Sequence, residues 1–184
     1  MALTMILTGD VNLMKVADPA VPFRRVGAEL RQADVVFGNL ECCLTVPATH
    51  SHGNEGFFAD PAVGGEALRL GGLQAVGIAN NVHYGDANIM ASIARLDEVG
   101  VAHTDAGANW AFARAPAILR RDGVRFGFVQ HSSVYWPKIY RFCARQEFVS
   151  RHKMAAYQPA RPVLGASLNV CSGARAAGRA DRAE

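Results

Sequence analysis

Short hydrophobic runs alternate along the chain with segments that repeat a hydrophobic residue every three or four positions. Each short run stops at polar side chains, which predicts buried strands of a parallel sheet. These strands occupy residues 3–8, 34–39 and 73–79. The segments with helical spacing occupy residues 22–33, 61–70 and 88–99. The alternation predicts β-α-β units with right-handed crossovers, and the expected fold class is therefore α/β.

The later part of the chain predicts a short strand and then a hairpin. Residues 101–104 form the strand, and residues 116–121 and 124–130 form an antiparallel pair around Arg121-Asp122-Gly123. Residues 45–56 are expected to be a polar loop. Beyond residue 137 no firm hydrophobic period remains, so residues 138–184 are expected to hold a weak helix or a disordered tail.

The composition indicates one globular domain without an obvious charged partner. Of 184 residues, 50% are hydrophobic and 19% are charged. The net charge of +3 comes largely from the tail, and no basic stripe with aromatic residues predicts a nucleic-acid partner. The start of the chain lacks a basic leader, and no apolar run reaches membrane-spanning length. We therefore expect no membrane segment in this chain and a cytoplasmic location.

The four cysteines do not predict a metal site. Cys42 and Cys43 are adjacent, which fits neither zinc-ligand spacing nor a disulfide framework. Buried free thiols are the preferred interpretation, also for Cys143 and Cys171.

Polar side chains follow three predicted strands in succession. They are Asp10, then Asn39 and Glu41, then Asn80, Asn81 and His83. The carboxyl ends of parallel strands share one edge of a sheet, so these groups are expected to converge in one cleft. Carboxylate, amide oxygen and imidazole suit Mn, Zn, Fe or Mg. Such an ion would polarise a phosphoryl oxygen and lower the pKa of a bound water.

Each of these residues also has a purely structural explanation. Asp10 could cap backbone amides in a turn, and Asn39 and Asn81 could occupy turn or left-handed positions. Glu41 could be a solvated loop carboxylate, and His83 could be a hydrogen-bonded structural residue. The coincidence of three strand ends favours the metal site.

Several segments resemble, in order, motifs of the CapA family of bacterial capsule and poly-γ-glutamate synthesis. The segments are residues 7–13 (LTGDVNL), 36–41 (VFGNLE), 77–85 (GIANNVHYG) and 100–109 (GVAHTDAGAN). The resemblance covers residues 4–137, which places the domain at residues 1–137, and residues 138–184 match poorly. It implies a calcineurin-like metallophosphoesterase-type β-sandwich flanked by helices, incomplete at the C-terminus.

The resemblance also implies roles for single residues. Asp10, Glu41 and Asn81 match metal-holding positions, and Asn39 and His83 would orient substrate or water. The chain departs from the family at Val82, where many members carry a histidine, with His83 one residue later. Family members continue to later histidines that complete the metal site. Because this sequence lacks them, we expect a truncated chain.

Two functions follow from these motifs. The first is a metal-dependent hydrolase with a phosphoesterase-like site in capsule or poly-γ-glutamate synthesis, acting on a polymer or phosphoester substrate, with capsule-synthesis proteins as partners. The alternative is a non-catalytic accessory or remnant domain that positions a partner in polymer assembly. The incomplete sheet also predicts self-association through exposed edge strands.

Two other groups of residues are set aside. Gly64-Gly65 and Gly71-Gly72 make no nucleotide-binding glycine loop and are interpreted as turns. His131, Ser132 and Ser133 follow a predicted strand, but no strained nucleophile turn accompanies them, so they are interpreted as peripheral to the site.

Overall fold

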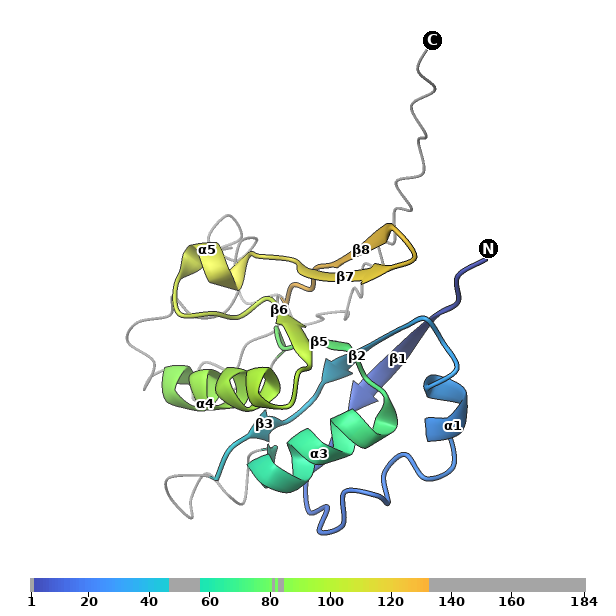
Figure 1. The fold of residues 1–184 in the computed structure, drawn as a ribbon. Coiled ribbons are helices and arrows are strands. Elements are labelled where there is room, and N and C mark those ends of the chain that lie inside the picture. Colours follow the sequence, from blue (N-terminus) through green and yellow to red (C-terminus); the bar gives the residue numbers. More distant parts are fainter. Residues whose placement is uncertain (1, 47–56, 81, 83–84, 133–184) are drawn as a thin grey trace, which may run out of the picture.

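A four-stranded parallel sheet in the order β1-β2-β5-β6 forms the centre of the fold (Figure 1). The computed structural model describes residues 2–46, 57–80, 82 and 85–132. The strands of this sheet are β1 (Met5–Val11), β2 (Val35–Leu40), β5 (Ala75–Gly77) and β6 (Ala102–Thr104). A second parallel pair joins β3 (Cys43–Leu44) to β4 (Phe58–Ala59). The expected α/β class with a parallel sheet is confirmed.

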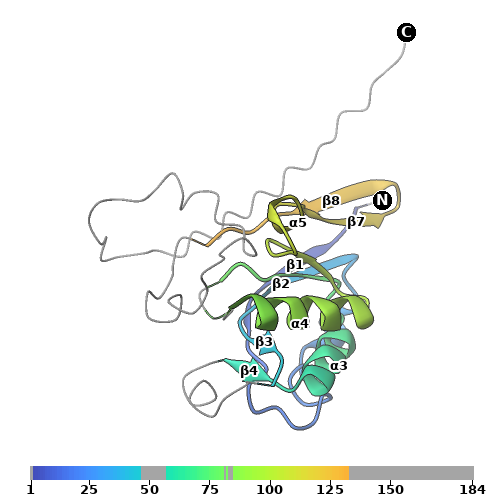
Figure 2. The same cartoon turned by 90° about the vertical axis from the view of Figure 1, so that its left-hand side faces the viewer.

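The sheet lies between a helical layer and a hairpin layer. The helices on one side are α1 (Gly27–Leu30), α3 (Pro61–Gly71) and α4 (Gly85–Glu98). On the other side are α5 (Trp110–Ala113) and the antiparallel strands β7 (Ala117–Arg121) and β8 (Val124–Phe128). Figures 1 and 2 show the hairpin above the sheet and α3 and α4 below it.

The core fills the space between the sheet and the helical layer. Val36, Leu40 and Val76 from the strands meet Leu68 of α3 and Leu96 of α4, and all five are fully buried. Burial of these side chains is the main driving force for docking the helices on the sheet. The predicted free thiols of Cys42 and Cys43 are buried in the same region, and burial raises the pKa of the Cys42 thiol to about 11. Cys143 and Cys171 lie outside the described residues.

Helix α3 begins and ends where the sequence expects. The Asp60 side chain caps it by accepting a 2.9 Å hydrogen bond from the Val63 N–H, and Gly72 ends it in the left-handed conformation with φ of 81°. Gly64 and Gly65, however, lie inside the helix and not in a turn. A Cβ at Gly64 would come within 2.7 Å of Leu44, so the missing side chain lets α3 approach β3 closely.

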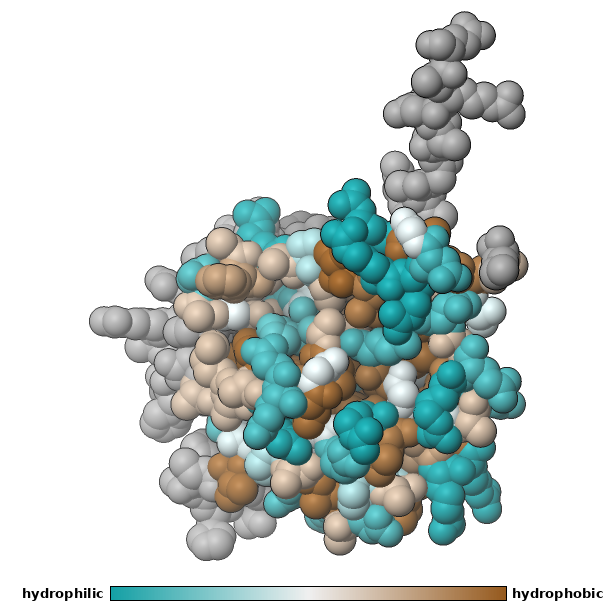
Figure 3. Space-filling model, in the orientation of Figure 1, coloured by the Kyte–Doolittle hydropathy of each residue, from teal (hydrophilic) through white to brown (hydrophobic). Residues whose placement is uncertain are grey.

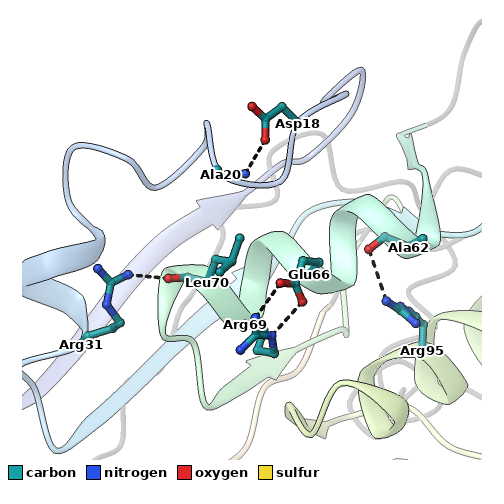
Figure 4. Close-up of polar contacts among 8 residues, drawn as sticks. All are labelled: Asp18, Ala20, Arg31, Ala62, Glu66, Arg69, Leu70 and Arg95. Atoms are coloured by element: carbon teal, nitrogen blue, oxygen red, sulfur yellow. Dashed lines mark hydrogen bonds and ion pairs between the residues drawn. The ribbon is translucent and has the colours of Figure 1, made fainter.

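Polar contacts fix α3 against its neighbours (Figure 4). Arg31, just after α1, donates a 2.5 Å hydrogen bond to the Leu70 carbonyl at the end of α3. Arg95 of α4 donates to the Ala62 carbonyl near the start of α3 at 3.3 Å. Glu66 and Arg69 pair along the exposed side of the helix at 2.6 Å. The two arginine contacts tie the helical layer together at both ends of α3.

The first strand and the first helix differ from their predicted forms. β1 continues to Val11, so Asp10 lies within the strand and not after it. β1 is also an edge strand, because only β2 pairs with it among the described residues. Leu7 in this strand is 44% exposed. The helix predicted over residues 22–33 is reduced to Gly27–Leu30, since tight turns that close at Arg24 and Val26 occupy the preceding residues.

The predicted hairpin forms with the expected turn. Arg121 pairs with Val124, which leaves Asp122 and Gly123 as a two-residue loop. Their φ angles of 47° and 77° are both positive, as a type I′ turn requires. Arg121 also donates a 2.9 Å hydrogen bond to the Asp34 carbonyl just before β2, which attaches the hairpin to the sheet.

The surface mixes residue types. Figure 3 shows hydrophilic and hydrophobic residues interspersed on the face seen in Figure 1. Within the part of the chain that the structure describes, no helix has both the length and the apolar character needed to span a bilayer.

Candidate functional site

The carboxyl ends of β1 and β2 bring Asp10, Asn39 and Glu41 together. Asp10 and Asn39 are register partners in the parallel ladder, after an irregularity between Leu7 and Asp10 in β1. Glu41 follows β2 directly, and its N–H donates a 2.9 Å hydrogen bond to the Val11 carbonyl. Three of the residues singled out in the sequence therefore share one edge of the sheet, as the parallel arrangement requires.

Asn39 is the centre of this cluster. Its Nδ2 donates to Asp10 Oδ1 and to Glu41 Oε2, both at 2.7 Å. The two carboxylate oxygens are therefore no further apart than twice that distance. On the other side, Asn39 Oδ1 accepts from Gln130 Nε2 at 2.8 Å and from Asn80 Nδ2 at 3.3 Å. Both donors and both acceptor positions of the amide are used, which fixes its orientation.

Asn80 holds the loop that follows β5. Its Nδ2 donates to the Leu40 carbonyl at 2.6 Å, and its Oδ1 accepts from the Val82 N–H at 3.0 Å. Asn80 is 3% exposed, and Val82 is also buried. The Val82 carbonyl in turn accepts a 3.3 Å contact from Cys43 Sγ. Asn80 thus positions the backbone of this loop, and Val82 belongs to the core.

The other two residues singled out for this loop have no described position. Asn81, predicted to hold the metal, and His83, predicted to orient substrate or water, lie outside the described residues. Their roles stay predictions.

The electrostatics of the cluster favour a positive partner. Burial raises the pKa of the Glu41 carboxyl above its ordinary value, and the nearby Asp10 carboxylate raises it further, although the hydrogen bond from Asn39 opposes both effects. Two carboxylates held against one neutral amide fit a hard divalent ion, because Mg²⁺ is usually bound by one or two carboxylates and keeps several waters. No group of three or more His, Cys, Asp and Glu side chains suited to a metal occurs among the described residues.

A second polar group lies at the end of β6, and it was not predicted from the sequence as part of a site. Asp105 follows β6 directly, is fully buried and has a φ of 69°. One of its carboxylate oxygens accepts from the backbone N–H of Gln130, and the other lies 3.5 Å from His131 Nδ1. Burial raises the pKa of this carboxyl to about 7, against the opposing hydrogen bond from Thr104. The strand-end rule that located Asp10 would also have found Asp105.

The hairpin layer brings Gln130 to the cluster. Phe128 at the end of β8 stacks on Phe37 of β2, with ring centroids 4.5 Å apart and an interplanar angle of 5°. This contact anchors β8 over the sheet. A Cβ at Gly77 would overlap the Gln130 side-chain amide, so the bare backbone of β5 makes room for it. Gln130 therefore links the Asp105 group to Asn39.

One surface cleft lies away from this cluster. It has a volume of about 350 Å³ and is lined by residues that include Phe23, Arg24, Arg31 and Arg69. These residues precede β2 and β5 in the chain, so the cleft faces the amino ends of the strands. The candidate site is at the opposite edge of the sheet.

A parallel α/β sheet with acidic and amide side chains gathered at its carboxyl edge defines a protein whose ligands are expected at the strand ends. Residues 4–170 match the family model described as "Bacterial capsule synthesis protein PGA_cap". The chain belongs to this family of bacterial capsule synthesis proteins. The match extends past residue 137, where the sequence predicts the domain boundary, and that boundary stays a prediction. Among curated proteins, none matches the chain.

Proposed function

We propose that this capsule synthesis protein is a divalent-cation-dependent hydrolase of phosphoester bonds in the synthesis of a capsular polymer such as poly-γ-glutamate. The observation that carries the proposal is the convergence of Asp10 and Glu41 on the single nitrogen Asn39 Nδ2. Two ionised carboxylates held this close together repel each other, and a nearby positive charge offsets that repulsion. A cation would supply that charge.

The residues have separate roles in this proposal. Asp10 and Glu41 hold the cation, together with Asn81, which the family motif implies. The cation supplies Lewis acidity towards a phosphoryl oxygen and acidifies a bound water. Asn39 fixes the two carboxylates relative to each other, and Asn80 fixes the following loop through its bonds to Leu40 and Val82. His83 would contact substrate or water.

The metal is Mn, Zn, Fe or Mg in this proposal, since carboxylate, amide oxygen and imidazole ligands together suit this set. The fold in this proposal is the calcineurin-like sandwich of two sheets. The described residues supply a four-stranded parallel sheet with a two-stranded hairpin on its open face. This arrangement is compatible with such a sandwich.

Hydrolysis of a generic aryl phosphate ester tests the function. The purified chain is assayed with Mn²⁺, Zn²⁺, Fe²⁺ and Mg²⁺ in turn, beside Asp10→Asn and the control Asp122→Asn. Asp122 is an exposed turn residue whose left-handed φ suits asparagine equally well. We expect Asp10→Asn to lower kcat/KM at least about 100-fold, because even partners outside the ligand shell cost 10–100-fold. No turnover with any ion by folded protein contradicts the proposal.

The second candidate is a non-catalytic accessory domain that positions a partner in polymer assembly. Buried Val82 favours it, because the family motif that this loop resembles has a histidine at that position. Metal analysis of the protein purified without chelators separates the two functions. The hydrolase requires an ion that is lost in Asp10→Asn, whereas the accessory domain requires none.

A further inference from the structure

The cleft at the amino edge of the sheet carries a concentration of positive charge. It lies between the turns that follow β1 and the end of α3, and its volume is about 350 Å³. Figure 4 shows the turn at Asp18 and Ala20 beside the last residues of this helix. Among the described residues that line it, three are arginines and none is acidic. We call it the arginine cleft, after Arg24, Arg31 and Arg69.

Two glycines at the end of α3 shape one wall of the arginine cleft. A Cβ at Gly71 would come within 2.6 Å of the Phe23 ring, and one at Gly72 within 2.7 Å of Arg31 Cγ. The bare backbone therefore lets the aromatic ring and the arginine stem pack directly against the helix end. Arg31 Nη1 also donates a 2.5 Å hydrogen bond to the Leu70 carbonyl. These contacts place the Arg31 guanidinium before any ligand binds.

The charges of the arginine cleft are only partly balanced. Arg69 pairs with Glu66 through two hydrogen bonds of 2.6 and 2.7 Å. Arg31 donates to a neutral carbonyl, and neither Arg31 nor Arg24 has an ion-pair partner among the described residues. Asp18 belongs to the neighbouring turn, but its side chain accepts a 2.9 Å backbone hydrogen bond within that turn and does not line the cleft. Two guanidinium charges are therefore available to a ligand.

We propose that the arginine cleft is a binding site for a small ligand that carries carboxylate or phosphate groups. A guanidinium presents its N–H donors in a planar fork that matches two oxygens of either group. Pro19 and Phe23 line the same cleft, so a short hydrocarbon stem on the ligand gains apolar contact as well. The volume is at the lower end of the range for small-molecule sites. In this assignment Arg24 and Arg31 bind the oxyanion.

This inference does not rest on the proposed hydrolysis, because the arginine cleft and the candidate site lie at opposite edges of the sheet. The two sites also differ in charge. Asp10 and Glu41 are carboxylates, which repel an oxyanion when no divalent ion is present. Binding of an oxyanion in buffer without divalent ions therefore reports the arginine cleft.

An NMR chemical-shift titration of the labelled full chain tests the site in such a buffer at constant ionic strength. The probes are glutarate, inorganic phosphate and glutaramide, the uncharged amide analogue of glutarate. We expect glutarate, phosphate or both to bind with a Kd on the order of 1 mM, as a few exposed charge-assisted hydrogen bonds allow. The amides around Phe23, Arg31 and Gly72 should shift. Glutaramide should not bind, and the tighter of the two anions identifies the chemical class of the ligand.

Arg24→Gln and Arg25→Gln form a matched pair of variants. Both remove one charge at adjacent exposed positions, so both should fold, but Arg25 does not line the cleft. We expect Arg24→Gln to weaken anion binding at least about 10-fold, because it removes charge-assisted hydrogen bonds. Arg25→Gln should weaken it by less than about 3-fold, since only screened, longer-range attraction is lost.

The possible outcomes decide the inference separately from the proposed function. No binding of either anion to wild type overturns it, and so does equal weakening in Arg24→Gln and Arg25→Gln. Binding of glutaramide as tight as that of glutarate overturns the role of the guanidinium charges. Absence of hydrolysis by wild type contradicts the proposed function but leaves the arginine cleft unaffected.

Discussion

Gln130 donates a 2.8 Å hydrogen bond to Asn39 Oδ1 across 91 positions of sequence. Through this bond the segment after β8 reaches the carboxylate pair that Asn39 holds at the ends of β1 and β2. The geometry of the site consequently depends on the docking of the hairpin as well as on the parallel sheet.

Replacing Asn39 removes the group that fixes both carboxylates. We expect Asn39→Ala to lower the free energy of unfolding by about 2–4 kcal/mol, because partners of four hydrogen bonds are left without their counterpart and two of them are charged. Urea denaturation measures the loss. Asn12→Ala is the control: its side chain accepts one bond, from the Met14 N–H at an exposed position, so about 0.5–1.5 kcal/mol is expected. An equal loss of unfolding free energy in both variants would show that the four hydrogen bonds of Asn39 stabilise the fold no more than the single bond of Asn12.

Glu41→Gln separates stability from cation binding. The raised pKa of Glu41 means that the fold disfavours its ionised form, so we expect the neutral variant to be more stable without cations at pH 7. The gain is expected to be less than about 1 kcal/mol, because solvent screens a partly exposed group. Adding Mn²⁺ should raise the Tm of wild type but not the Tm of Glu41→Gln.

Glu66→Gln is the matched control for that measurement. The hydrogen bond from Arg69 lowers the pKa of Glu66, so its ionised form is favoured and the substitution should slightly destabilise the protein. It should keep the full Mn²⁺ response. The same sign of change in both variants contradicts the electrostatic explanation.

A methyl group at Gly77 tests whether the Gln130 side chain packs against the backbone of β5. We expect Gly77→Ala to lower the free energy of unfolding by about 1–3 kcal/mol, because its Cβ overlaps the Gln130 amide. Adding Gln130→Ala should recover part of the loss, and a double-mutant cycle measures that coupling. Gly9→Ala is the control, since no atom of the described residues lies within 4 Å of the place that its methyl group would take. Additive losses in the cycle would mean that the two residues do not compete for space.

Asp105 gives the stability a distinct dependence on pH. Its pKa rises from 3.8 to about 7 on folding, so between these values the folded state holds more protons than the unfolded state. The contribution of Asp105 is fully present below about pH 4 and is lost as pH rises through 7, by up to about 1.4 kcal/mol per pH unit. Asp105→Asn should lose less stability than wild type over this window in urea titrations at each pH. Asp122→Asn should follow wild type, and parallel curves for wild type and Asp105→Asn would contradict the assignment.

Local patterns predict the strands and the polar residues at their ends. The apolar run before Asn39 and Glu41 is a buried strand, as its composition requires, and Asp122-Gly123 forms the predicted turn. The rule that carboxyl ends of parallel strands share an edge was enough to bring Asp10 to Asn39. That part of the site follows from hydrophobic periodicity combined with this rule.

The remaining contacts depend on tertiary packing, which periodicity does not report. Gln130 reaches Asn39 because Phe128 stacks on Phe37 and because Gly77 has no side chain. Neither condition is visible within one segment. Gly64 lies inside α3 for a similar reason, since its close approach to a residue of β3 outweighs the poor helix propensity of glycine.

The span of sequence between Asp10 and Gln130 also sets the order in which the site is built during synthesis. A nascent chain that has emerged only as far as α4 already carries the acidic pair and its asparagine, but not Gln130, which donates to that asparagine. Contacts between residues so distant along the chain form slowly, because a large loop must close before they stabilise anything. We therefore expect the candidate site to be complete only after the hairpin has left the ribosome.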